Sequence, residues 1–164
     1  MAIYHPPTFI NKYLQDKLGK DFDVPFFPTS PTAIDDLTET FPESTTFCVY
    51  DRMLKMRRTP FPHIKCEQLM YYFYSTGDDA VPKVIEITQK VQDLLDYEDE
   101  SAQELNEWIK NNPQLGPDGQ PMPLPFFHRL RIYQLQETRD IIDFGTARTY
   151  AGNKIIIDYD WHKS

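Results

Sequence analysis

Acidic residues near the end of the chain form the pattern that most resembles a metal site. Asp158 and Asp160 lie two positions apart in an alternating stretch, so on a β-strand both carboxylates share one face. Carboxylate oxygens are preferred ligands of Mg²⁺, and Asp143 or Asp51 would supply a further one. One hypothesis is therefore a small Mg²⁺-dependent enzyme that uses Asp158, Asp160 and Asp143. The competing interpretation is that the apolar residues of this stretch face the core while both aspartates face water.

Other motifs of catalysis and cofactor binding are missing from the sequence. The chain has six glycines, and they form neither a phosphate-binding loop nor a Gly-x-Gly-x-x-Gly fingerprint. No serine lies in a Gly-x-Ser-x-Gly nucleophile elbow. The histidines are far apart in the sequence and have no His or Cys at ligand spacing, which argues against a metal site. They are His5, His63, His128 and His162.

Two blocks of charge are the remaining polar features. Residues 52–65 hold five basic residues and no acidic one, whereas residues 93–107 hold seven acidic residues and no basic one. Either block alone is explained by a solvated face. Together they are complementary patches, which predicts a contact between copies of the chain or with another protein. The interface candidates are a basic tip (Arg52, Lys55, Arg57 and Arg58) and an acidic stretch (Asp96, Glu98, Asp99 and Glu100).

Composition narrows the class of protein. The chain has 164 residues, 17 Lys and Arg, 25 Asp and Glu, and a net charge of −8. This length predicts a single domain over 1–164. The acidic balance argues against general binding to nucleic acid or to an anionic membrane. No apolar run approaches the length of about 18 residues that crosses a membrane, and the first residues predict no secretory signal.

Proline marks the boundaries of the expected elements, because it is excluded from central strands. Residues 20–45 are proline-rich and predict an extended arm within the domain. Periodicity predicts helices at 8–18, 79–96 and 101–110, the last with Ser101 as its N-cap. It predicts strands at 46–56 and 63–75, which form a long hairpin, and strands at 126–136 and 148–161 joined by a short link. The two cysteines, Cys48 and Cys66, lie on the hairpin, and we expect them to be unbridged thiols.

This order of elements predicts an α+β fold, with an antiparallel β-sheet that contains the long hairpin and helices flanking one face. The apolar stripe of the helix at 79–96 needs an apolar sheet face to cover it. We therefore expect one shared core, which comprises Ile85, Val91, Leu95, Ile155, Ile157 and Trp161.

Several stretches together resemble one protein family. They are IKCEQLMYYFYS at 64–75 running into the helix at 81–95, PFFHRLRI at 125–132, and the closing strand at 148–161 with its end DYDW. The pattern is similar to that of tail terminator proteins of long, contractile-tailed bacteriophages, which stabilise the tail sheath. The resemblance covers roughly half of the chain, and the proline-rich arm has no counterpart in it.

The resemblance implies a structural virion protein without catalytic activity or cofactor, assembled in the cytoplasm of a bacterial host. It implies a homo-hexameric ring that caps the tail tube and joins the tail to the neck. Its partners would be further copies of itself and the tube, sheath and neck or connector proteins, with genomic DNA only passing through the lumen and no membrane contact. A neck or head–tail joining protein is the nearest alternative.

Overall fold

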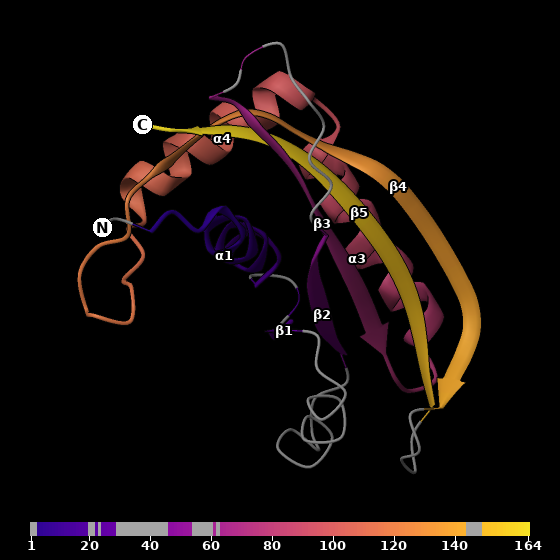
Figure 1. Ribbon diagram of the computed structural model, residues 1–164. Coiled ribbons are helices and arrows are strands. Elements are labelled where there is room, and N and C mark those ends of the chain that lie inside the picture. Colours follow the sequence, from indigo (N-terminus) through magenta and orange to yellow (C-terminus); the bar gives the residue numbers. More distant parts are fainter. Residues whose placement is uncertain are drawn as a thin grey trace.

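The computed structural model describes residues 3–19, 22, 24–28, 46–53, 61, 63–143 and 149–164. The elements, in chain order, are α1 (Pro6–Gly19), β1 (Phe26–Pro28), β2 (Thr46–Met53), β3 (Lys65–Ser75), α3 (Ala80–Leu95), α4 (Glu98–Asn111), β4 (Pro125–Asp143) and β5 (Thr149–Lys163) (Figure 1). Strands and helices are segregated along the chain, and the sheet is mainly antiparallel. The expected α+β class is therefore confirmed.

The sheet has the strand order β1-β2-β3-β5-β4. The hairpin expected from the sequence is confirmed, because β2 pairs antiparallel with β3 from Thr46↔Ser75 to Met53↔Gln68. β5 pairs antiparallel with both β3 and β4. The short strand β1 belongs to the expected proline-rich arm and pairs parallel with β2 at one edge of the sheet. Most of the rest of that arm lies outside the described residues.

The strand β4 is longer than the sequence analysis predicts. It continues through 137–143, where a link was expected, and it curves together with β5 along its whole length (Figure 1). The pairing shifts register at three places along β4: 127/129, 132/134 and 138/141. The first two shifts each place one extra residue in β4 and the third places two, so the regular alternation along the strand is interrupted. A continuous two-residue period therefore cannot be recognised in the sequence.

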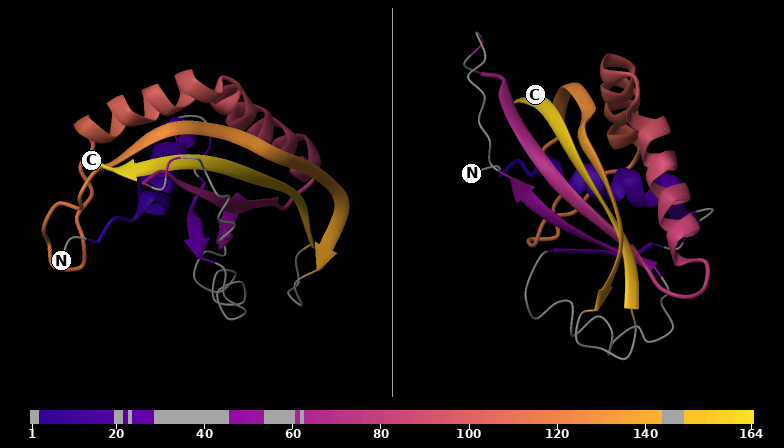
Figure 2. Two further views of the ribbon diagram at one scale, coloured as in Figure 1. Left: turned by 45° about the horizontal axis from the view of Figure 1, so that its top comes forward. Right: turned by 90° about the vertical axis from the view of Figure 1, so that its right-hand side faces the viewer.

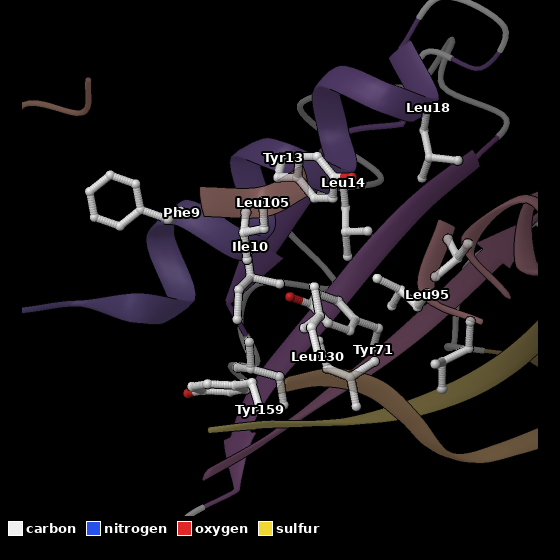
Figure 3. Packing of buried hydrophobic residues seen from close by; sticks show 14 of the residues in the cluster. Phe9, Ile10, Tyr13, Leu14, Leu18, Tyr71, Leu95, Leu105, Leu130 and Tyr159 are labelled. Atoms are coloured by element: carbon white, nitrogen blue, oxygen red, sulfur yellow. The ribbon is translucent and has the colours of Figure 1, made fainter. Parts of the chain in front are cut away.

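One face of the sheet carries the core and all three described helices. Alternate residues of β3 and β5, among them Tyr71 and Ile157, are fully buried against side chains from α1, α3 and α4. Figure 3 shows this packing, with Tyr71, Leu130 and Tyr159 of the strands facing residues of α1. The right-hand view of Figure 2 places α3 and α4 on one side of the strands. The expectation that helices flank one face is confirmed.

The core prediction is correct at five positions: Val91, Leu95, Ile155, Ile157 and Trp161. It is wrong for Ile85, which is only partly buried. Its neighbours Val84 and Ile87 are buried instead. The apolar stripe of α3 is therefore rotated slightly from the one expected.

The helix α4 begins three residues earlier than predicted, at Glu98. Ser101 is thus an interior residue rather than an N-cap, and its Oγ donates to the Leu94 carbonyl of α3 at 3.0 Å. The first turn instead contains Glu98, Asp99 and Glu100. Carboxylates in this position interact favourably with the helix dipole, which explains the earlier start.

Both cysteines are buried free thiols, as expected. Cys48 pairs with Phe73, which lies seven positions along β3 from Cys66. The separation along the strand is therefore about 23 Å, and the odd spacing places the two side chains on opposite faces. A disulfide needs α-carbons within about 7 Å, so this geometry excludes one. Within the described residues, no helix is both long enough and apolar enough to span a bilayer.

Candidate functional site

The acidic stretch lies at the junction of α3 and α4. Asp96 is exposed in the short connection between the helices, and Asp99 and Glu100 are exposed in the first turn of α4. Glu98, the fourth member, turns toward the edge strand β4. The stretch therefore presents three carboxylates to solvent and uses the fourth within the chain.

Glu98 binds two arginines of β4. The Arg129 guanidinium donates to Glu98 Oε2 at 2.8 Å, and that of Arg131 donates to Oε1 at 3.3 Å. These hydrogen bonds, that from Arg129 first, hold the pKa of Glu98 below its usual value. Both arginines are thereby engaged inside the chain.

Most of the basic tip lies outside the described residues. The backbone of Arg52 belongs to β2 and pairs with Leu69 of β3. Lys55, Arg57 and Arg58 fall in the segment 54–60, of which the structure gives no description. The contact expected between the tip and the acidic stretch therefore stays a prediction.

The three aspartates of the Mg²⁺ hypothesis do not come together. Asp143 pairs with Thr149, whereas Asp158 pairs with Arg131, nine residues further along β5. The separation is about 30 Å along the strand. Across the described residues, no group of three or more His, Cys, Asp or Glu side chains could hold a metal ion. The hypothesis of a three-aspartate site is thus contradicted by the register of the sheet.

The competing interpretation is also wrong in one respect, because Asp158 does not face water. Its side chain is buried, accepts a hydrogen bond from Gln68 Nε2 at 2.5 Å and forms an ion pair with Arg131 at 3.3 Å. A buried carboxylate needs such partners, since removing an ion from water is costly. Asp158 thus links β3, β5 and β4, and through Arg131 it is connected to Glu98 of α4.

Three of the histidines are close in space, although they are far apart in the sequence. His128 Nε2 and His162 Nδ1 are 2.5 Å apart, and the His63 ring lies 6.0 Å from that of His162. The ring of Phe126 packs against both His128 and His162. Burial, and then the neighbouring His162, lower the pKa of His128, while Asp160 acts in the opposite direction. The separation of these histidines in the sequence therefore does not carry over to the fold.

No sequence signal points to this cluster, because it depends on the pairing of Phe126 with His162 at the end of the sheet. The two nearest ring nitrogens face each other, and one must donate to the other. Only if both rings were fully protonated would two N–H groups and two positive charges face each other. The arrangement suits a structural, pH-sensitive contact.

The chain matches no protein-family model, and a search of curated proteins finds no match either. Neither comparison therefore assigns the chain to a family.

Proposed function

We propose that this protein is a structural component of a bacteriophage tail, a terminator that assembles into a hexameric ring. The ring would cap the completed tail tube and sheath and join the tail to the neck in the virion. Its partners would be further copies of itself, the tube protein, the sheath protein and the neck protein.

The observation that supports this proposal is that the stretches resembling tail terminators adjoin one another in the fold. Residues 64–75 span β3 and lead into α3, residues 125–132 form the first part of β4, and residues 148–161 include most of β5. In the sheet β5 lies between β3 and β4, and buried residues of α3 share the core of these strands. The resemblance thus covers one continuous layered unit.

Charge is compatible with this role. The net charge of −8 opposes tight binding of phosphate backbones, which would impede the passage of a genome through the ring. The separation of Asp143 from Asp158 argues against the Mg²⁺ site that combines Asp158, Asp160 and Asp143. A neck or head–tail joining protein would have a similar ring form, and the two differ in their position in the virion.

The test is the assembly state of the chain, followed by its location. Native mass spectrometry is expected to give about six times the 19.4-kDa chain mass, and negative-stain microscopy a ring with a central hole. Immunogold labelling of virions is expected to mark the upper end of the tail. A chain that stays monomeric, alone and with tail tubes, would overturn the proposal. Labelling at the connector instead would assign the protein to the neck.

A further inference from the structure

A surface groove between α1 and α4 has the character of a binding site. Its larger part has a volume of about 770 Å³, and a second hollow of about 420 Å³ shares Trp108 as a wall. Three glutamates of α4, Glu100, Glu104 and Glu107, line the larger part. Lys17 also lines it, and Lys110 pairs with Glu107 at 3.2 Å, so the three carboxylates exceed the two ammonium groups by one negative charge.

The groove also contains a buried hydroxyl whose neighbouring acceptor, the Glu104 carboxylate, does not reach it with hydrogen-bonding geometry. Tyr13 is 1% exposed and packs edge-on against Trp108, with ring centroids 5.6 Å apart. Within the described residues its hydroxyl meets no acceptor at hydrogen-bonding geometry. Burial, and then the charge of the Glu104 carboxylate and its capacity to accept a hydrogen bond, raise the pKa of Tyr13 to about 12, so the hydroxyl keeps its proton. A buried donor without a well-aligned acceptor is costly, and an incoming carbonyl oxygen would remove that cost.

The chemistry of the groove selects a basic, extended segment as its occupant. Guanidinium groups can pair with Glu100 and Glu104 and stack on the indole of Trp108. A backbone carbonyl of the same segment can accept from the Tyr13 hydroxyl. The pair Arg129 and Arg131 cannot serve, because Glu98 already binds both within the chain. The basic tip has four basic residues in 52–58 and no acidic one.

We propose that the groove between α1 and α4 receives the basic tip of a neighbouring copy of this chain, with Arg57 and Arg58 facing Glu100 and Glu104. The inference rests on the proposed ring and identifies the contact that joins its neighbouring subunits. Tip and groove consist of different residues, so a contact between them in neighbouring copies is head-to-tail, and such contacts close into rings when the rotation permits.

The test is a charge swap in the full-length chain. One variant reverses the groove (Glu100→Lys with Glu104→Lys), a second reverses the tip (Arg57→Glu with Arg58→Glu), and a third combines all four changes. The matched control is Glu86→Lys with Asp93→Lys, since both residues are exposed on α3 and do not line either hollow, and the charge change equals that of the groove variant. The fraction of ring is measured by native mass spectrometry and sedimentation velocity at low salt.

Each one-sided reversal should raise the concentration needed for ring formation by about tenfold or more, because like charges then face each other. The combined variant should recover to within about threefold of wild type, and the α3 control should match wild type. Tyr13→Phe should weaken assembly without lowering the thermal unfolding midpoint of the monomer, because in the monomer the hydroxyl is a buried donor without a well-aligned acceptor among the described residues.

The outcomes separate the two proposals. A wild-type chain that never forms a ring overturns the proposed function. A wild-type ring that tolerates the groove reversal as well as it tolerates the α3 control overturns only the assignment of the groove. If the one-sided reversals lower the stability of the monomer while assembly is unchanged, the contact lies within one chain, and the assignment to a neighbouring copy is wrong.

Discussion

Asn106 of α4 substitutes for a neighbouring strand at the edge of the sheet. Its Nδ2 donates to the Phe127 carbonyl at 2.8 Å, and its Oδ1 accepts from the Phe127 N–H at 2.9 Å. β4 is an edge strand, so without this side chain both backbone groups would lack a partner. Asn106 is itself 7% exposed, and the contact is therefore shielded from water.

Asn106→Ala should lower the free energy of unfolding by about 2–4 kcal/mol. Each buried backbone group left without a partner costs roughly 1–3 kcal/mol, and water entering the vacated space recovers part of the sum. Asn106→Asp retains an acceptor for the N–H but directs a carboxylate at the Phe127 carbonyl. We expect a loss at least as large for this variant at neutral pH.

The assay is urea unfolding followed by far-UV circular dichroism, under conditions in which the chain is monomeric, because assembly would add to the apparent stability. With a slope of about 2 kcal/mol/M, the midpoint should fall by about 1–2 M. Hydrogen exchange of the Phe127 amide gives a local measurement, and its protection should drop in both variants.

Asn111→Ala is the matched control, because Asn111 lies on the same helix, is exposed and donates to the Glu107 carbonyl. Its effect should stay within about 0.5 kcal/mol. The reasoning is refuted if Asn106→Ala costs no more than this control, or if the Phe127 amide keeps its protection.

Three further predictions test the core, the thiols and the histidine pair. Ile157→Ala should cost about 2–5 kcal/mol in urea unfolding, because the side chain is fully buried in the shared core; a loss below about 0.5 kcal/mol would mean that the faces of β5 are wrongly assigned. Alkylation of denatured, unreduced protein should count two thiols, Cys48 and Cys66, and a count of zero would contradict the structure. The native protein should react slowly, because both thiols are buried and burial raises the pKa of Cys48. Burial and His162 lower the pKa of His128 from 6.5, so on acidification the unfolded chain binds its proton before the folded chain does. The free energy of unfolding should therefore be at its full value above about pH 6.5 and fall as the pH drops toward the folded-state pKa. Unfolding midpoints at about pH 7.5 and pH 5 should differ less in His128→Gln than in the wild type.

Local periodicity was enough to predict several elements. The alternation in 63–75 and 148–161 predicted β3 and β5, and the helical period in 79–96 predicted α3 to within one residue at each end. The same periods identified most of the core, since a strand or helix with one apolar face must bury that face. These features depend on side chains that are close in sequence, and so they can be read without the fold.

Local signals misled where the chain departs from regular geometry. Bulges in β4 concealed the second half of that strand. The spacing of Ser101 and Glu104 resembled a capping box, yet α4 starts at Glu98, where carboxylates favour the helix dipole. The capping-box spacing and the run of carboxylates are two signals for the start of a helix, and here they lie within one turn of each other. The sequence alone does not show at which of them the helix begins.

The polar arrangements depended on tertiary structure. Strand register separated Asp143 from Asp158, placed Arg131 beside Asp158 and brought His128 to His162. The packing of α4 on the sheet edge joined Asn106 to Phe127, and the approach of α1 to α4 placed Tyr13 in an acidic groove. A shift in register changes neither the composition nor the period of a strand. It does change the distance between two side chains on different strands. The sequence by itself therefore determined the apolar layers, and only the tertiary structure decided which charges and hydrogen-bonding groups meet.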